Sequence, residues 1–553
     1  MRKTKVIPVL LGLSAMAVAL SAGCSPKKEE YKTFTMFATM SGSEIDSDND
    51  VQKLIAEKTG VKVKETWLQG QDGEQAVGSM LASETLTDFI DAGNSYPTLL
   101  TAEVLVPWDS YLEKHKNLKD MYTEAEWDMF RQADGKIYWA NVFQNHKNAA
   151  TTCTHNDEAF WIQARVLEWG GYPKIETLDD YFDLIEKYIA ANPKDSDGAD
   201  YIGYTCLCEG WKYYCIENAG QFLDGYPNDG SVIVDKSSGK PTIVDYNTTD
   251  TTKRYLKKLN EEYAKGIVDK EFATQTEDEY IANLSSGHVL GMCDQYWNFQ
   301  KINDTLKSHG RDKDGCNYIP LGLTIDRGMT NRWHTYGDTV NVSSGVSVTT
   351  KCTDPDAAFK FLNDVLDQEI HDLRFWGVKD VDYKVDADGK FYRTEEMRKN
   401  AADTNYKASH LCPYSYLPQW GGTSDDGINA NFPTEQDSEF QLSLAEPVVN
   451  VFKAYGVGNY VDMIGSPEEP LGAWFPMWSY SNDLKPDMPG GEAWQEMGNV
   501  KHEWLPKLVT TNDFDGMWED YMKAYEAVHP NEFLDVMQKE LDRRIEAAAK
   551  YEH

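Results

Sequence analysis

The chain reads TFTMFA at residues 33–38, VQKLIAEKTG at residues 51–60 and VKVK at residues 61–64. The first and last stretches are short and apolar enough to form strands. In the middle stretch Val51, Leu54 and Ile55 are spaced i, i+3 and i+4, which predicts a helix, and Gly60 supplies its stop. The order strand, helix, strand is typical of an α/β fold with a mostly parallel sheet.

The same alternation continues along the chain. A helix is predicted over residues 73–83, and a buried strand over residues 88–92 leads into the polar loop GNSYP at residues 93–97. Further helices are predicted over residues 178–190, 251–264, 355–366, 519–525 and 532–550. Repeats of 20 to 50 residues and low-complexity linkers after residue 33 are lacking in the sequence, so we expect interleaved domains.

The composition excludes some classes of partner. The 553 residues include 54 basic and 90 acidic side chains, a net charge of −36, which repels the phosphates of nucleic acids. Apolar residues at 41% and charged residues at 26% are typical of soluble proteins. The 16 Trp and 31 Tyr residues suit a protein that stacks rings against a ligand. We therefore expect no nucleic-acid partner.

The first residues have the features of an export signal. Three basic residues precede an apolar stretch over residues 6–22, so residues 1–23 are predicted to be a signal peptide. The sequence LSAGC at residues 20–24 resembles the lipobox of bacterial lipoproteins, which implies that Cys24 carries a lipid. The usual lipobox has Leu three residues before the cysteine, where this chain has Ser21. Residues 24–33 are predicted to form a polar tether behind the lipidated cysteine. Plain secretion, with Cys24 as an ordinary cysteine, is the alternative.

The other eight cysteines are scattered between residues 153 and 412. Cys206 and Cys208 are the one close pair, and neither a CxxC motif nor histidines at zinc-ligand spacing accompany them, which argues against a structural metal site. An exported chain can form disulfides, so both disulfides and free thiols remain open at this point.

Several segments, taken in order, carry a family resemblance. They are AEKTGVKV (56–63), MLASETLTDFI (80–90), LVPWDSYL (105–112), DGKIY (134–138), residues 161–178, GIVD (266–269), SGHVLGM (286–292), and FWG (375–377) with DY (382–383) and DGK (388–390). The chain resembles the extracellular solute-binding proteins of bacterial carbohydrate ABC importers, in the large lipoprotein branch of Gram-positive bacteria. The resemblance covers nearly the whole mature chain.

The resemblance implies a periplasmic-binding-protein-like fold of type 2, in which two interleaved α/β lobes are joined by a hinge. We expect residues 34–145 and 346–400 to form the N-terminal lobe. Residues 146–345 and 401–553 are expected to form the C-terminal lobe, including the last helices. Ligands of such sheets lie outside the carboxyl ends of the strands, in the cleft between the lobes.

The resemblance also implies a function. The chain is expected to capture a carbohydrate, in particular an oligosaccharide, without covalent chemistry or a required cofactor, and to deliver it to ABC importer permease subunits. It is expected to act as a monomer, lipid-anchored on the extracellular face of the bacterial cytoplasmic membrane. A binding protein for peptides or another solute, a secreted glycoside hydrolase and a surface adhesin are the alternatives. The sequence has no GxSxG, HExxH or phosphate-loop motif that would favour an enzyme.

Sugars present apolar faces and hydroxyl edges, so their sites combine aromatic rings with polar side chains. By resemblance, Trp297 in GMCDQYWN (291–298) and Trp420 in PQWGG (418–422) are the leading candidates. The other ligand-binding candidates lie in predicted loops: Asn94, Tyr96, Asn298, Trp211, Glu209, Trp333, Tyr336 and Glu44. The tryptophans expected in the core are Trp108, Trp169, Trp376 and Trp518.

A second feature of the family is a calcium loop after the helix over residues 178–190. Here Asp195, Asp197 and Asp200 alternate with other residues and could offer oxygens to calcium. Lys194 and Tyr201 replace expected ligands, and a bidentate Glu is not evident. A plain acidic turn is the alternative.

Overall fold

The computed structural model describes residues 31–69, 72–143 and 145–551. The predicted signal peptide, Cys24 and most of the tether lie outside the described residues. Within the described part, none of the helices combines the length and the apolar character needed to cross a bilayer.

The first lobe is built on a five-stranded sheet with the strand order β2-β1-β3-β11-β4. Its strands are β1 (Lys32–Ala38), β2 (Val61–Trp67), β3 (Phe89–Asp91), β11 (Val346–Val348) and β4 (Trp139–Ala140). β1 pairs in parallel with β2 and β3, whereas β11 runs antiparallel to β3 and β4. The predicted parallel start of the sheet is confirmed.

Helices α1 (Asp50–Thr59) and α2 (Gly73–Ala82) connect these strands where the sequence predicts them. The side chain of Asn49 caps α1 by accepting from the Gln52 N–H, and Gly60 ends it with φ of 77°. That left-handed conformation favours glycine. The other elements of this lobe are η1 (Gly93–Ser95), α3 (Tyr96–Thr101), α4 (Asp109–Leu112), α5 (Lys116–Lys119), α6 (Glu124–Met129), α15 (Pro355–Asp364), α16 (Gln368–Phe375), β12 (Lys384–Val385), β13 (Phe391–Tyr392), α17 (Glu395–Ala402) and α18 (Thr404–His410).

The second lobe is built on the antiparallel sheet β10-β6-β9. Its strands are β6 (Glu158–Gln163), β9 (Gly291–Gln295) and β10 (Tyr318–Leu321), and every residue of β6 is buried. The surrounding elements up to residue 308 are α7 (Ala164–Trp169), α8 (Leu178–Ala191), η2 (Gly210–Tyr213), α9 (Tyr214–Glu217), α10 (Ala219–Leu223), β7 (Ile233–Asp235), β8 (Thr242–Val244), η3 (Tyr246–Thr248), α11 (Asp250–Lys265), α12 (Glu277–Ser286), α13 (Tyr296–Phe299) and α14 (Ile302–Ser308).

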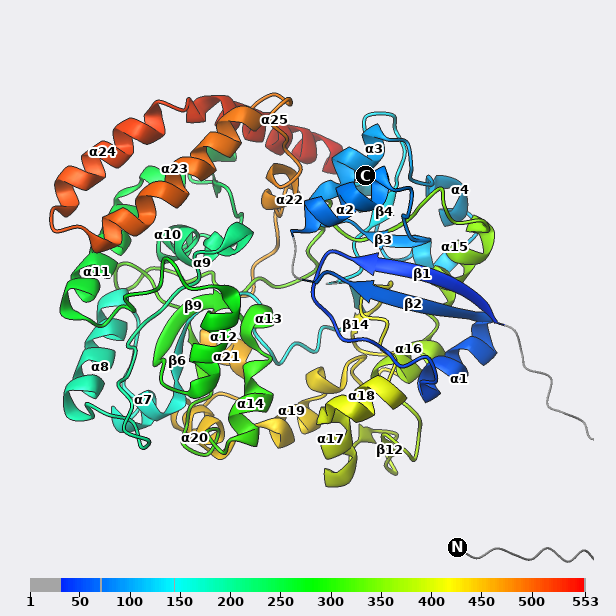
Figure 1. Cartoon of the computed structure of the whole chain (residues 1–553), viewed down its shortest axis with the longest axis horizontal. Helices are drawn as coiled ribbons and strands as arrows, with labels where there is room; N and C mark the ends of the chain where they lie inside the picture. Colours follow the sequence, from blue (N-terminus) through cyan, green and yellow to red (C-terminus); the bar gives the residue numbers. More distant parts are fainter. Residues whose placement is uncertain (1–30, 70–71, 144, 552–553) are drawn as a thin grey trace, which may run out of the picture.

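The C-terminal helices complete the second lobe. They are η4 (Pro433–Glu435), α19 (Asp437–Ser443), α20 (Glu446–Tyr455), α21 (Tyr460–Ile464), α22 (Trp478–Ser481), α23 (Gly491–Thr510), α24 (Phe514–Glu526) and α25 (Pro530–Ala548). Figure 1 shows α23, α24 and α25 along the top of this lobe. The helices predicted near residues 519–525 and 532–550 correspond to α24 and α25.

Each lobe has its own hydrophobic core, and each core draws on separate stretches of chain. The first contains residues from 34–142, 340–370 and 412–420, and the second contains residues from 153–333 and 440–541. The two lobes lie side by side in Figure 1. The predicted α/β fold of two interleaved lobes is confirmed.

Three segments cross between the lobes and lie against one another. β5 (His146–Lys147) pairs in parallel with β14 (Gly421–Gly422). The Asp338 carboxylate accepts from the His146 backbone N–H at 3.1 Å, and the Thr154 hydroxyl donates to Glu435 at 2.5 Å. These contacts join the three crossings into a hinge.

The chain re-enters the second lobe later in the sequence than the expected boundary at residue 401. Tyr414 and Leu417 belong to the first core. The fully buried guanidinium of Arg374 holds this loop, because it donates to the carbonyl oxygens of Val365, Pro413, Tyr414, Leu417 and Pro418. We therefore propose that the first lobe extends to the crossing segment at residues 421–436.

The question of disulfides is answered for the eight cysteines between residues 153 and 412. All eight are free thiols, and all except the half-buried Cys208 are buried. They behave as small apolar residues of the cores.

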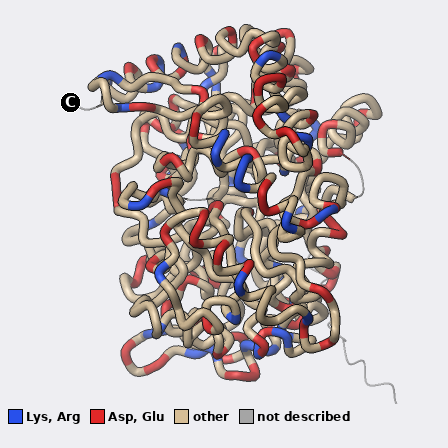
Figure 2. Tube along the Cα trace, turned by 90° about the vertical axis from the view of Figure 1, so that its left-hand side faces the viewer, with Lys and Arg blue, Asp and Glu red and all other residues tan. Residues whose placement is uncertain are grey.

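Acidic side chains are spread over the molecule. Figure 2 shows Asp and Glu scattered over the whole height of the face it presents, with Lys and Arg interspersed among them. This distribution fits the net charge of −36.

Replacing Arg374 tests the proposed boundary of the first lobe. Arg374→Lys is expected to lower the free energy of unfolding by about 3 kcal/mol, because a single ammonium cannot satisfy all the buried carbonyl oxygens that the guanidinium serves. Urea unfolding measures the change. The control is Arg327→Lys, whose exposed guanidinium pairs with Glu176 and Asp180 at the surface, where solvent screens the interaction. Equal losses in the two variants would show that the buried clamp is unimportant.

Candidate ligand-binding site

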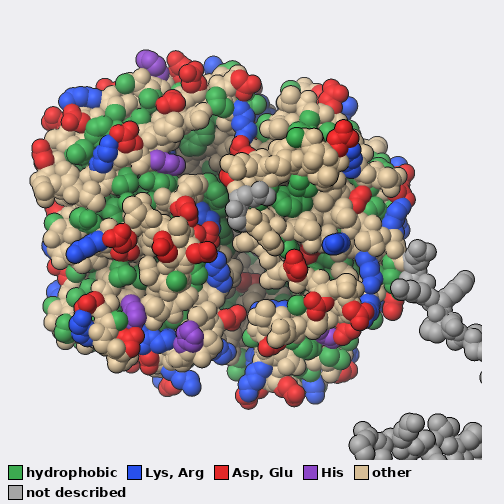
Figure 3. All heavy atoms as spheres, viewed as in Figure 1, with side chains coloured by type: hydrophobic (Ala, Val, Ile, Leu, Met, Phe, Trp, Pro, Cys, Tyr) green, Lys and Arg blue, Asp and Glu red, His purple; other side chains and the backbone are tan. Residues whose placement is uncertain are grey.

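A groove separates the two lobes and is visible in Figure 3. The carboxyl ends of β1 and β2 point toward the second lobe, and α13 lies on the side of the second lobe that faces the first (Figure 1). α13 directly follows β9. Strand ends therefore border the groove from both sides, which is the position expected for a ligand site.

Three aromatic residues form a cluster on the second lobe, which we call the aromatic platform: Trp211 of η2, Tyr214 of α9 and Trp297 of α13. The rings of Trp211 and Trp297 stack with centroids 5.8 Å apart and planes 10° apart. Tyr214 lies 5.9 Å from Trp211 and 6.2 Å from Trp297. Trp211 is 58% exposed, so the platform offers a broad indole surface to solvent.

A buried carboxylate holds the platform from beneath. Asp294, in β9, accepts from the hydroxyl of Tyr214 at 3.0 Å, from the hydroxyl of Tyr280 at 2.8 Å and from the amide of Asn298 at 2.9 Å. Burial raises the pKa of Asp294, and these donors oppose that rise. The amide oxygen of Asn298 also accepts from Lys212 at 2.9 Å. Asn298 is thus buried, and its side chain forms hydrogen bonds within the protein that position Asp294 and Lys212.

The loop that carries Trp211 is tied to α12. The Lys212 ammonium lies 2.6 Å from the Glu277 carboxylate, and the Glu209 carboxylate accepts from the Glu277 backbone N–H at 2.6 Å. Glu209 is exposed beside the platform. Four of the predicted residues, Trp297, Asn298, Trp211 and Glu209, are therefore brought together by the fold.

Rings that the sequence analysis missed lie at the carboxyl end of β2. Trp67, the last residue of that strand, packs edge-on against Tyr416 at 5.3 Å, and Tyr416 packs edge-on against Phe143 at 5.1 Å. A Cβ at Gly42 would lie 2.2 Å from the Trp67 ring, so the absence of a side chain there allows the loop to cover the indole. The position of Trp67 at a strand end was the signal that could have predicted it.

Three predicted ligand residues are core residues instead. Tyr96 is fully buried, stacks on Trp139 at 4.3 Å and donates to the Gly345 carbonyl at 2.6 Å. Trp333 is also fully buried and stacks on Phe222 at 4.2 Å. Trp420 is 6% exposed and belongs to the first core. Large rings beside a sheet are buried here because distant segments pack over them.

The remaining candidates lie elsewhere. Asn94, in η1 after β3, and Glu44, in the loop after β1, are exposed on the first lobe. Tyr336 is half-buried and lines a cavity of about 220 Å³ whose walls do not include the described platform residues. Among the expected core tryptophans, Trp108, Trp376 and Trp518 are buried. Trp169 is 44% exposed, because it is the last residue of α7.

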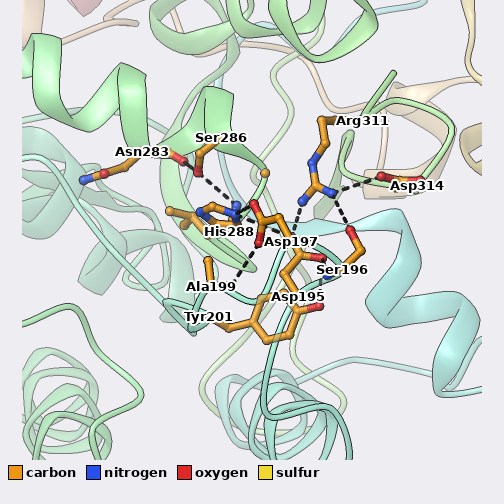
Figure 4. Close-up of polar contacts among 12 residues, drawn as sticks. Asp195, Ser196, Asp197, Ala199, Tyr201, Asn283, Ser286, His288, Arg311 and Asp314 are labelled. Atoms are coloured by element: carbon orange, nitrogen blue, oxygen red, sulfur yellow. Dashed lines mark hydrogen bonds and ion pairs between the residues drawn. The ribbon is translucent and has the colours of Figure 1, made fainter. Parts of the chain in front are cut away.

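The side chains of the predicted calcium loop pair with cationic side chains of the protein, and Figure 4 shows Arg311 and His288 beside Asp195 and Asp197. The Asp195 carboxylate is paired with the guanidinium of Arg165 at 3.0 Å and with that of Arg311, and it accepts from the Tyr201 hydroxyl at 3.2 Å. Asp197 pairs with His288 at 2.7 Å. Calcium requires six to eight oxygen ligands, and here two cations already neutralise the central carboxylate. Asp200, the third predicted ligand, turns away to pair with Lys194 at 2.5 Å. The residues present do not fit a calcium site.

The comparison with protein families identifies the chain. A family model described as bacterial extracellular solute-binding protein matches residues 52–371. The chain belongs to this family. Among curated proteins, none matches the sequence significantly. The family consists of extracellular binding proteins, and the predicted recognition is confirmed.

Solved structures share the fold of this solute-binding protein. The calcium-free alginate-binding protein AlgQ2 aligns with a TM-score of 0.61 at 15% identity, over 93% of this chain and 99% of that chain. An HMO-binding, ABC-transporter-associated protein from Bifidobacterium longum infantis gives 0.61 at 15% identity with the same coverage. An EF-hand mutant of S. pneumoniae FusA in complex with fructo-nystose gives 0.59 at 16% identity, again over 93% and 99%.

Calcium addition tests the assignment of the arginine-held loop. Addition of millimolar calcium to this solute-binding protein is expected to leave its melting temperature unchanged, because a ligand that does not bind the native state cannot shift the unfolding equilibrium. Differential scanning calorimetry measures it. A clear rise of the melting temperature with calcium would show that the loop binds the ion despite Arg165 and Arg311.

The same loop predicts a pH dependence of stability. Burial alone would raise the pKa of Asp195, but the Ser196 N–H and the guanidiniums of Arg165 and Arg311 outweigh it and lower the pKa to about 2. A carboxylate whose pKa is lowered in the folded state stabilises that state above its unfolded pKa of about 4, and the contribution is lost as the pH falls toward 2. The free energy of unfolding of wild type is therefore expected to exceed that of Asp195→Asn by about 2 kcal/mol near pH 6. This difference should shrink below about pH 4.

Urea unfolding at several pH values measures this difference. Asp200→Asn, which changes an exposed residue of the same loop, is the control and should follow wild type at every pH. A difference between wild type and Asp195→Asn that is independent of pH would contradict the role of the ionised carboxylate.

Proposed function

We propose that this protein captures an oligosaccharide in the groove between its lobes. The observation that carries the proposal is the aromatic platform, because Trp211 stacks in parallel on Trp297, which follows the end of β9, and leaves indole surface exposed. The apolar C–H faces of sugar rings stack on such surfaces, and two adjacent indoles suit more than one sugar unit. A chain of sugars is the ligand class that this surface fits best.

Both lobes are proposed to contact the ligand. Trp67 and Tyr416 supply rings on the first lobe, and Asn94 and Glu44 are exposed polar groups on the same lobe. Glu209 and Lys212 are polar groups at the platform that could bond sugar hydroxyls. A ligand that contacts both lobes binds the closed form more tightly than the open form, and this difference in affinity shifts the equilibrium toward the closed form. Capture then requires no covalent chemistry and no catalytic residue.

The neighbouring structures support this ligand class. Their descriptions name alginate, HMO and fructo-nystose, which are all carbohydrates. At 15–16% identity they share the fold, so the choice of sugar rests on the side chains of this chain. The family of extracellular solute-binding proteins favours binding over the glycoside hydrolase alternative.

We further propose delivery of the sugar to ABC importer permease subunits, by a monomer anchored through lipidated Cys24 on the extracellular face of the cytoplasmic membrane. The sequence LSAGC at residues 20–24 supports the anchor. Two of the neighbouring structures are described as ABC-transporter-associated or as an ABC-transporter substrate binding protein, which supports the importer.

Tryptophan substitutions test the platform. Trp297→Ala and Trp211→Ala are each expected to weaken oligosaccharide binding by about 1–2 kcal/mol, or about 5- to 30-fold, because each removes a stacking surface. A glycan array identifies the ligand, and isothermal titration calorimetry measures the affinities. Trp169→Ala, which removes an exposed indole at the end of α7, is the control and should bind as wild type does.

Three results would contradict the proposal. Unchanged affinity in both platform variants would place the sugar elsewhere. Binding of peptides without binding of oligosaccharides, or turnover of a glycoside panel, would replace the proposed ligand class or the proposed non-enzymatic role.

A further inference from the structure

Two segments near the hinge bring a pair of histidines together. His155 precedes β6, and His334 lies between β10 and β11. Their Nδ1 atoms are 3.0 Å apart. The Oδ2 atom of Asp157 lies 3.9 Å from His334 Nδ1, and the potential ligand atoms of all three residues lie within 4.8 Å of one another.

The surroundings fix how His155 presents its ring. Its Nε2 lies 2.8 Å from the Glu158 carbonyl oxygen, which can only accept, so Nε2 carries the hydrogen. Nδ1 of His155 therefore holds a lone pair that points at His334. In metal-binding histidines, the ring nitrogen that does not bind the metal commonly donates its hydrogen to a backbone carbonyl. This hydrogen bond sets the tautomer and the orientation of the ring.

His334 is held equally firmly. Its backbone N–H donates to the Ser466 hydroxyl at 3.0 Å, and its ring packs edge-on against Tyr336 at 4.7 Å. Its side chain is 6% exposed, whereas that of Asp157 is 30% exposed. His334 also lines the cavity of about 220 Å³. The cluster thus combines fixed imidazoles with a carboxylate that solvent reaches and an open volume beside it.

We propose that His155, Asp157 and His334 form a binding site for a divalent transition metal ion, with zinc as the best fit. The ligand atoms are Nδ1, Oδ2 and Nδ1, and water completes a tetrahedral set from the cavity side. Two imidazole nitrogens on one zinc ion lie about 3.4 Å apart, so the rings need to separate by only a few tenths of an ångström. Imidazole ligands favour zinc over calcium or magnesium.

A direct hydrogen bond from His334 Nδ1 to His155 Nδ1 is the competing explanation of the 3.0 Å distance. In that case the Asp157 carboxylate would serve only as an acceptor for the Thr335 backbone N–H. A metal ion would instead use all three residues and cross-link the segment that enters β6 with the crossing segment that carries His334. The cluster shares no residue with the aromatic platform, so the zinc proposal can be tested independently of the proposed sugar ligand.

Metal titration of the mature chain tests the site. The protein is stripped of metal with a chelator and titrated with Zn²⁺ by calorimetry, with Ca²⁺ and Mg²⁺ as separate arms. We expect one equivalent of zinc to bind and to raise the melting temperature, with no effect of the other two ions. Cobalt(II) bound in place of zinc should give the intense visible absorption of a tetrahedral site.

Variants locate the bound ion. His334→Ala should abolish the zinc response, and the milder Asp157→Asn should weaken zinc binding about 10-fold or more while circular dichroism and sugar binding stay as in wild type. His288→Ala, which alters the histidine beside Asp197, is the matched control and should retain the response. The proposal is overturned if zinc does not bind, if binding survives in both His334→Ala and Asp157→Asn, or if His288→Ala is the variant that loses it.

Discussion

The triple crossing of the chain between the lobes is the constraint on which the rest of the structure depends. Pairing of β5 with β14 and the contact of His146 with Asp338 join the crossings side by side. Since each core is built from segments on both sides of a crossing, each lobe folds around strands and helices that are distant in sequence.

Among the described contacts, one ion pair between the lobes is largely buried: Arg398 of α17 lies 3.0 Å from Glu439 of α19. Two others involve more exposed side chains. Lys485 pairs with Glu74 at 3.0 Å, and Lys407 lies 3.9 Å from Asp304. Exposed pairs of this kind contribute less than about 1 kcal/mol each, so they resist opening only weakly. A hinge held by backbone pairing and weak outer ion pairs is compatible with the proposal that a bound ligand shifts the population toward a closed form.

The platform shows how stability and function are linked. Asp294 is costly to bury, and its hydrogen bonds to Tyr214, Tyr280 and Asn298 offset that cost while fixing the side chains beneath the indoles. A rigid stacking surface loses little entropy when a ligand binds. In the loop at residues 195–200, Arg165 and Arg311 perform the corresponding task for Asp195 with fixed positive charges.

The sequence by itself determined the order of elements at the start of the chain and pointed to the strand end beside which the aromatic platform lies. Apolar spacing and caps such as Asn49 and Gly60 act within one turn of chain, so α1 and its flanking strands could be predicted locally. The strand-end position likewise pointed to Trp297. Only the tertiary structure decided which rings are exposed, because Tyr96 is covered by Trp139 and other predicted rings are covered by equally distant segments. The tertiary structure also decided that Asp195 pairs with an arginine. Its partner Arg311 lies 116 residues away and therefore leaves no signal in the local sequence.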